Sequence, residues 1–75
     1  MKIKDAIRKA MKGNRYQSMV DMFPAVIGMT GSSMKQATFE REFRRYIHLI
    51  PHRVKERIGS NNAIYNVFIK QVGSI

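Results

Sequence analysis

The fold is decided by one stretch of the chain, Met22-Phe23-Pro24-Ala25-Val26-Ile27-Gly28-Met29-Thr30-Gly31-Ser32-Ser33-Met34-Lys35-Gln36-Ala37. Pro24 has no backbone N–H, so we expect a helix to about Met22 and a short second helix over residues 24–27 that Pro24 opens. Gly28 can end this short helix, and the serines that follow can cap the next one. The stretch therefore predicts two helical segments, a tight turn and a third helix.

Helical spacing extends on both sides of this stretch. Downstream, Phe39, Phe43, Ile47 and Ile50 follow one another in steps of four, four and three, which predicts a helix of about 17 residues that ends before proline. Upstream, apolar residues at helical spacing predict an amphipathic helix over residues 2–12, with Gly13-Asn14 as its stop.

The C-terminal third allows two interpretations. Pro51 is suited to open another short helix that ends at Gly59, and Ser60 can cap a last helix that closes at Gly73. Residues 63–72 are also rich in β-favouring side chains at alternating positions, so a short strand or wing is the alternative there.

The length and composition limit the architecture. The chain has 75 residues and no cysteine, so it suits one domain whose small core has no disulfide to support it. We therefore expect a single helical domain over residues 1–75, an all-α bundle of about four to five helices that contains a helix-turn-helix-like element. Because a dimer buries further surface, we also expect a homodimer.

The charge is strongly positive and uneven. The sequence has 14 Lys and Arg against 5 Asp and Glu, a formal net charge of +9. The cations gather in residues 1–15 and 35–57, on both sides of a nearly neutral, methionine-rich centre. Clustered cations attract polyanions because phosphate neutralisation releases condensed counterions.

The residue types argue against catalysis and against a membrane span. His48 and His52 are separated by Pro51 and have no third ligand nearby in the sequence, so we expect no metal site. The few carboxylates are isolated or interleaved with arginines, and no glycine-rich phosphate loop is present, so we expect no enzyme and no cofactor. No apolar stretch approaches the ~20 residues of a membrane helix, and no secretory signal is evident, so we expect a cytoplasmic protein.

The helix after the turn would carry the recognition chemistry. Ser32, Ser33, Lys35 and Gln36 would face outward from its N-terminal half, the part that enters a major groove in a helix-turn-helix. A glutamine can pair with adenine through two hydrogen bonds, and a lysine can reach guanine or a phosphate.

Over about residues 16–40, and above all at Ile27-Gly28-Met29-Thr30, the chain resembles small phage helix-turn-helix regulators, namely the CII-type transcription activators and lambda-repressor-like modules. The resemblance implies a transcription regulator, encoded by a phage or mobile element, that binds duplex DNA. Carried over by position, Ser33, Lys35 and Gln36 would read bases, and Arg15 and Thr38 would lie near phosphates.

The predicted DNA-binding set comprises Arg15, Ser32, Ser33, Lys35, Gln36, Thr38, Arg41, Arg44 and Arg45. The three arginines at its end either form a phosphate-contacting ridge or pair with Glu40 and Glu42 along the helix. The alternative function is a non-enzymatic interaction module, such as an antirepressor, inhibitor or antitoxin-like protein, that docks on an acidic protein.

Overall fold

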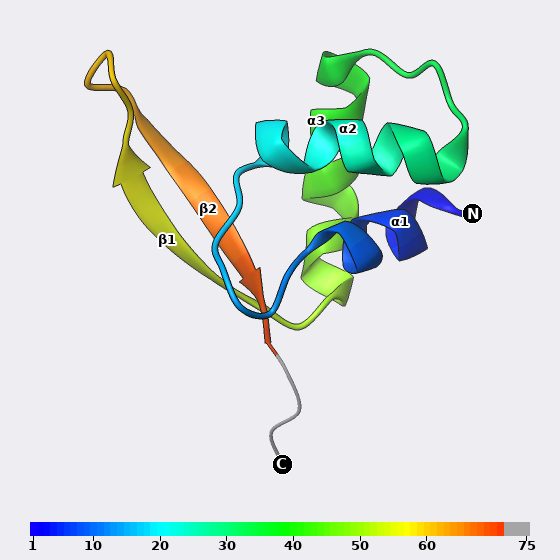
Figure 1. Ribbon diagram of the computed structural model, residues 1–75, viewed down its shortest axis with the longest axis horizontal. Helices are drawn as coiled ribbons and strands as arrows, with labels where there is room; N and C mark the ends of the chain where they lie inside the picture. Colours follow the sequence, from blue (N-terminus) through cyan, green and yellow to red (C-terminus); the bar gives the residue numbers. More distant parts are fainter. Residues whose placement is uncertain (72–75) are drawn as a thin grey trace.

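The computed structural model describes residues 1–71 of the chain. Its helices pack together on one side of the molecule, and a β-hairpin projects from them on the other (Figure 1). In chain order the elements are α1 (Ile3–Ala10), α2 (Met19–Thr30), α3 (Gln36–Tyr46), the 3-10 turn η1 (Ile47–Leu49), β1 (His52–Ile58) and β2 (Ile64–Lys70).

The core lies where the apolar faces of the three helices meet. α1 buries Ala6, Ile7 and Ala10, which share one face because Ala10 lies four residues after Ala6 and three after Ile7. α2 and α3 add further buried side chains, among them Met22, Val26, Phe39 and Phe43. Burial of such side chains is the main favourable term in the folding of a small domain.

All four phenylalanines of the sequence form one row of ring contacts that joins the helices to the hairpin. The ring centroids are 5.1 Å apart for Phe23 and Phe39, 5.9 Å for Phe39 and Phe43, and 4.9 Å for Phe43 and Phe68. Pairs of this kind contribute roughly 0.5–1.5 kcal/mol beyond the area they bury. Phe68 therefore anchors β2 to the helical core.

The hairpin has a regular antiparallel register and an isolated bridge to the segment before α2. Val54 lies opposite Phe68, and Ile58 lies opposite Ile64. On the other edge of β2, Gln17 and Phe68 exchange two backbone hydrogen bonds of 2.9 and 2.8 Å. β2 is therefore the middle strand, with the segment before α2 on one side and β1 on the other.

The predicted all-α bundle of four to five helices is wrong. Within residues 1–71 the chain forms three α-helices, one 3-10 turn and a two-stranded antiparallel sheet. The segment after Pro51, expected as a short helix, is β1. The segment capped by Ser60, expected as a helix, contains β2, so the strand alternative is the correct one over Ile64–Lys70. The predicted stop at Gly73 lies outside the described residues.

The physical reason is that the apolar spacing fits both structures. Val54 and Ile58 are four residues apart, which places them on one face of a helix and also on one face of a strand. The intervening turn decides between them: Gly59 and Asn62 close it, with Asn62 at a φ of 63° and the Gly59 N–H donating to the Ala63 carbonyl at 2.8 Å. Once this turn forms, pairing with β2 satisfies the backbone of the whole segment.

The predicted break before Pro24 is also wrong, because α2 runs without interruption from Met19 to Thr30. Pro24 leaves the Val20 carbonyl without its helical donor. Both Pro24 and Val20 are exposed, so the ring points into solvent and water can reach that carbonyl. Met22, two residues before Pro24, and Val26, two residues after it, are buried and hold the helix against the core.

Two other helices agree with the predictions apart from their ends. The helix expected over residues 2–12 is present as α1, although it ends before the Gly13-Asn14 stop because Met11 is already extended. The long helix expected before Pro51 is present as α3 followed by η1. Within residues 1–71, no helix has the length and apolar character to cross a membrane.

Candidate nucleic-acid interface

The connection between α2 and α3 is short and held by local hydrogen bonds. Gly31 caps α2 with a φ of 67°, in the left-handed region that favours glycine. The Thr30 hydroxyl donates to the Val26 carbonyl at 2.9 Å, and the Ser32 hydroxyl accepts from the Met34 N–H at 3.2 Å. The turn was expected in this region, but its glycine is Gly31 and not Gly28, which lies inside α2.

The start of α3 exposes most of the predicted reading residues. Ser33, Lys35 and Gln36 are exposed, whereas Ser32 and Thr38 are half-buried. Neither serine caps α3, because Lys35 is its N-cap residue and makes no side-chain capping hydrogen bond. The prediction that a serine caps this helix is therefore wrong, and the bond to Met34 holds the Ser32 hydroxyl in the loop.

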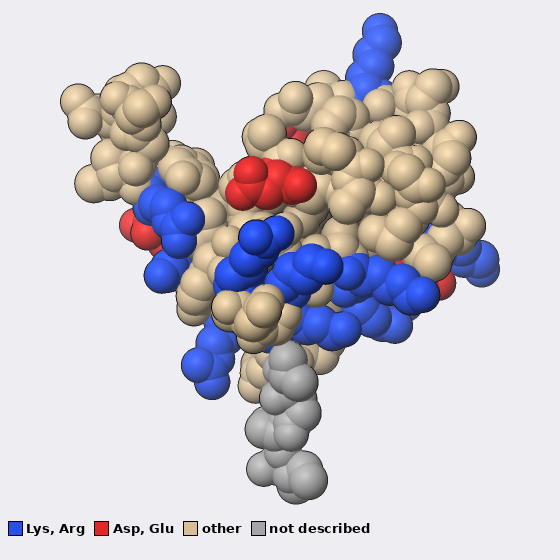
Figure 2. Space-filling view, viewed as in Figure 1, with Lys and Arg blue, Asp and Glu red and all other residues tan. Residues whose placement is uncertain are grey.

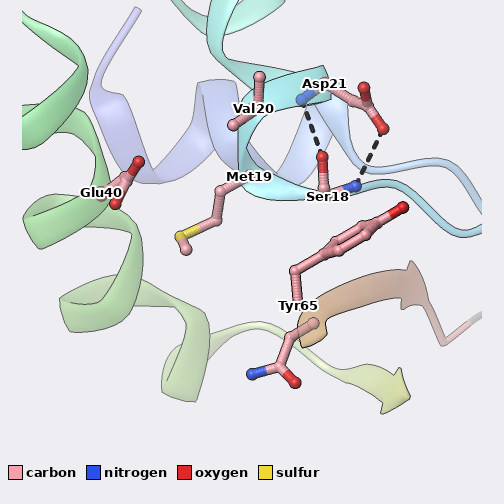
Figure 3. A pocket seen from close by; sticks show the side chains of 7 residues that line it. Ser18, Met19, Val20, Asp21, Glu40 and Tyr65 are labelled. Atoms are coloured by element: carbon pink, nitrogen blue, oxygen red, sulfur yellow. Dashed lines mark hydrogen bonds between the residues drawn. The ribbon is translucent and has the colours of Figure 1, made fainter. Parts of the chain in front are cut away.

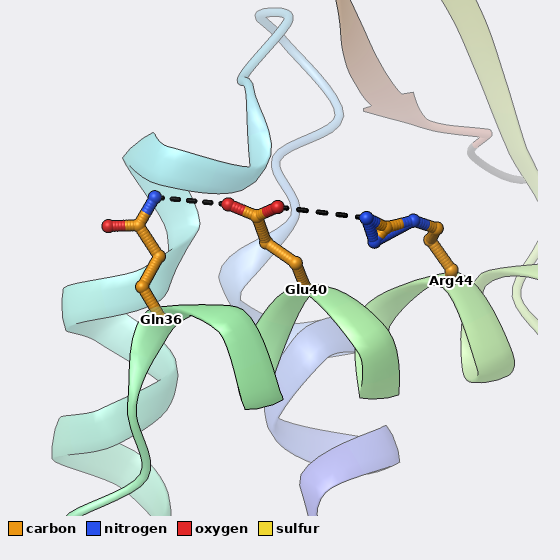
Figure 4. A network of polar contacts seen from close by, with 3 residues as sticks. All are labelled: Gln36, Glu40 and Arg44. Atoms are coloured by element: carbon orange, nitrogen blue, oxygen red, sulfur yellow. Dashed lines mark hydrogen bonds and ion pairs between the residues drawn. The ribbon is translucent and has the colours of Figure 1, made fainter.

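The outer side of α3 carries arginines that are partly neutralised. Figure 4 shows Gln36, Glu40 and Arg44 in a line along the helix. The Gln36 Nε2 donates to Glu40 Oε2 at 3.0 Å, and the Arg44 guanidinium lies 3.7 Å from Glu40 Oε1. On the next stripe, Arg45 lies 4.0 Å from Glu42 and its guanidinium carbon lies 5.6 Å from the Tyr46 ring centroid.

These contacts decide whether the arginines of α3 form a ridge free for phosphates or pair with carboxylates along the helix. Arg44 and Arg45 each pair with a carboxylate on their own helix. Arg41 is exposed and takes part in no ion pair among the described residues. The side of α3 that faces solvent is therefore polar and only weakly positive.

A hollow of about 440 Å³ separates α3 from the start of α2 and the edge of β2 (Figure 3). It is lined by Ser18, Met19, Val20, Asp21, Glu40, Tyr65 and Asn66. Ser18 and Asp21 satisfy each other in a capping box, each backbone N–H donating to the other's side chain at 3.2 Å. The two carboxylates make this hollow a poor place for a phosphate group.

Arg15 is not part of the α2–α3 unit. It lies in the loop between α1 and α2, where it lines a separate hollow with Tyr16, Gln17 and Asp21. Structural neighbours of this loop come from the hairpin: the Lys55 ammonium lies 4.2 Å from the Tyr16 ring centroid, and the Lys70 N–H donates to the Lys12 carbonyl at 2.8 Å. The structure thus brings the predicted residues of α3 together and places Arg15 with the sheet.

Figure 2 shows a band of Lys and Arg side chains across the lower part of the molecule, over the α1–α2 loop, α1 and the base of the hairpin. Sequence reasoning did not find this grouping, because it assigned residues 51–58 to a helix. The available signal was the alternation of Arg53, Lys55 and Arg57, which is typical of one face of a strand.

The two histidines lie near each other in the sequence but in different settings. The Nδ1 atom of His52 lies 2.7 Å from the Ile50 carbonyl oxygen, and His48 is exposed on η1. Across residues 1–71 no group of three or more His, Cys, Asp or Glu side chains is placed to hold a metal ion.

Comparison with known proteins gave no relative. No protein family, curated protein sequence or solved structure matches this chain.

Proposed function

We propose that this chain is a small, non-enzymatic protein that binds duplex DNA, with α3 as the helix that enters the major groove. The observation that carries the proposal is the position of α3, which packs on the core through Phe39, Phe43 and the partly buried Tyr46 and leaves its other side open. A major groove is ~12 Å wide and admits one α-helix. A helix held from one side by a short turn after α2 suits this geometry.

The exposed residues of α3 give this proposal its chemistry. Gln36 can donate to and accept from adenine, and Lys35 can reach guanine or a phosphate. Arg41, which pairs with no carboxylate among the described residues, is the cation best suited to a phosphate on this face. The net charge of +9 favours association with a polyanion such as DNA.

Transcription regulation by a homodimer is the role that fits this mechanism, because helix-turn-helix dimers read two half-sites about one helical turn apart. The regulator would be encoded by a phage or mobile element, as the resemblance near Ile27-Gly28-Met29-Thr30 suggests. Sedimentation or mass measurement with and without DNA tests the dimer separately from DNA binding itself.

The test of DNA binding is selection of a preferred site from a random duplex library, followed by fluorescence anisotropy at two salt concentrations. Gln36→Ala should cost about 1–3 kcal/mol on the selected site and little on unrelated duplexes. Arg41→Ala should weaken all duplexes alike and lower the salt slope by about 1. Lys9→Ala, an exposed cation on α1, is the control for charge loss. Absence of duplex binding at low salt would refute the proposal.

A further inference from the structure

The hairpin has two faces of different chemistry. Phe68 points into the core, so its neighbours Val67 and Ile69 point to the opposite side of the sheet. Arg53 lies opposite Ile69, Lys55 opposite Val67, and Arg57 opposite Tyr65. All three β1 cations therefore share the side that faces away from α3, which we call the outer sheet face.

The segment before α2 extends this face on the other edge of β2. Gln17 pairs with Phe68, so Tyr16 points to the outer sheet face. The contact between the Lys55 ammonium and the Tyr16 ring, 4.2 Å from its centroid, spans β2. This contact explains why Val67, which lies between them, is only 1% exposed although it points away from the core. The outer sheet face is thus an ordered surface with an aromatic edge.

The cations of the outer sheet face have no acidic partner among the described residues. Arg53, Lys55 and Arg57 are exposed and form no ion pair within residues 1–71. The acidic residue of β1, Glu56, lies between Lys55 and Arg57 and therefore points to the other side. Arg44 and Arg45 on α3, by contrast, each have a carboxylate partner. The cations of the sheet are therefore free to pair with an anion, whereas Arg44 and Arg45 would first have to leave their carboxylates.

A second aromatic ring stands at the distal end of this face. Tyr65 is 38% exposed and lies opposite Arg57. It also borders the hollow of about 440 Å³, together with Met19, Val20 and the amide of Asn66. In Figure 3 the Tyr65 ring extends beneath the start of α2 and Met19 points into the space beside it. A flat, uncharged group that enters here meets an aromatic ring, apolar walls and an amide, beside the carboxylates of Asp21 and Glu40.

We propose that the outer sheet face is a second nucleic-acid site, which binds single-stranded DNA or RNA. Arg53, Lys55 and Arg57 neutralise successive phosphates along β1, and an unstacked base packs against Tyr65. Single strands expose the π-faces of their bases, whereas a duplex stacks them inside, so only a single strand can use the ring. The proposal stands on the hairpin and does not depend on DNA binding by α3.

The experiment uses the full chain and two probes of equal length, a fluorescent oligothymidylate of about 20 nucleotides and a mixed-sequence duplex. Tyr65→Leu keeps an apolar side chain but removes the aromatic face, and should weaken single-strand binding roughly 5- to 150-fold. Tyr65→Phe keeps the face and should retain the affinity. Circular dichroism confirms that each variant is folded, and the change in tyrosine fluorescence on adding oligothymidylate reports stacking independently.

The contribution of the cations is tested with Arg57→Ala. This substitution should lower the slope of log K against log salt for single-strand binding by about 0.7. Lys9→Ala, with the same charge loss on α1, should have a smaller effect on oligothymidylate. Oligouridylate in place of oligothymidylate shows whether RNA or DNA is the better ligand.

Three results would overturn the proposal. The first is equal single-strand affinity of Tyr65→Leu and Tyr65→Phe. The second is loss of duplex and single-strand binding in parallel in the sheet variants. The third is displacement of oligothymidylate by polyglutamate at equal charge concentration, which would identify a site for acidic protein instead. Gln36→Ala and Arg41→Ala should leave single-strand binding unchanged, so failure of the α3 proposal is separately visible.

Discussion

Replacement of Glu40 by glutamine should strengthen duplex binding while it slightly weakens the fold. Glu40 accepts a hydrogen bond from Gln36 at 3.0 Å and holds the Arg44 guanidinium at 3.7 Å. Glu40 therefore engages both Gln36, a predicted base-reading residue, and the cation Arg44. It also places a negative charge where phosphates would approach. A glutamine side chain has nearly the same shape and can still accept from Gln36, so the substitution mainly removes charge.

The magnitudes follow from exposure and counterion release. The Arg44 and Glu40 side chains are 62% and 28% exposed, and a pair of this kind four residues apart on a helix contributes about 0.3–0.5 kcal/mol. Loss of the pair should lower Tm by about 1–4 °C in a domain of this size. Arg44, once free to neutralise one phosphate, should steepen the slope of log K against log salt by ~0.9 and raise affinity several-fold at low salt.

The assay is fluorescence anisotropy with one duplex at several salt concentrations, paired with a thermal melt. Glu56→Gln is the matched control, because it removes the same charge from an exposed position on a different element, β1. An unchanged salt slope in Glu40→Gln would show that Arg44 does not reach phosphate. A specific loss of affinity for the selected site would show instead that Glu40 itself reads a base, as a glutamate can at cytosine.

Four substitutions test the fold. Gly31→Ala should lower the free energy of unfolding by about 1–2 kcal/mol, because a side chain disfavours the φ of 67°. Gly28→Ala should instead raise it by about 0.5–1 kcal/mol, because Gly28 lies inside α2 and an added Cβ meets no atom within 4 Å. Equal effects of these two substitutions in chemical denaturation would contradict the observed end of α2. Phe43→Ala should cost about 3–5 kcal/mol by opening a cavity between α3 and β2, and native near-ultraviolet dichroism in that variant would count against the core described. Ser18→Ala should cost about 1 kcal/mol through loss of the capping box, and an unchanged melting temperature would show that the cap is unimportant.

The helices with one apolar face were predictable from the sequence, and the hairpin was not. Phe39, Phe43 and Ile47 follow one another in steps of four, which fit a helix or a strand, but the further step of three to Ile50 keeps the face of a helix and changes the face of a strand. Val54 and Ile58 fit a helix and a strand equally well, and the choice depends on pairing with β2, a contact between distant residues. The turn residues Gly59 and Asn62 were the local signal in favour of the strand.

The candidate site likewise has a part that was predictable from the sequence and a part that was not. Ser33, Lys35 and Gln36 were predicted on an exposed helix start from local pattern alone; all three are exposed, but α3 begins at Gln36, so Ser33 lies in the loop before the helix. The grouping of Arg15 with the sheet depends on the pairing of Gln17 with Phe68. No periodicity along the chain encodes which face of a strand will be covered by a helix, so the outer sheet face required the three-dimensional arrangement.

The hydrophobic core also decides where the positive charge lies. Side chains alternate along a strand, so a slip of one residue in the packing of β2 would exchange its two faces. Phe68 would then point outward, and Arg53, Lys55 and Arg57 would turn toward α3 with their β2 partners. Contact between Phe68 and Phe43 prevents this exchange, because it buries the aromatic ring of Phe68 in the core. The interaction that stabilises the hairpin therefore also keeps its cations on the outer sheet face, and a variant that releases Phe68 should lose the order of that charged surface together with the stability of the core.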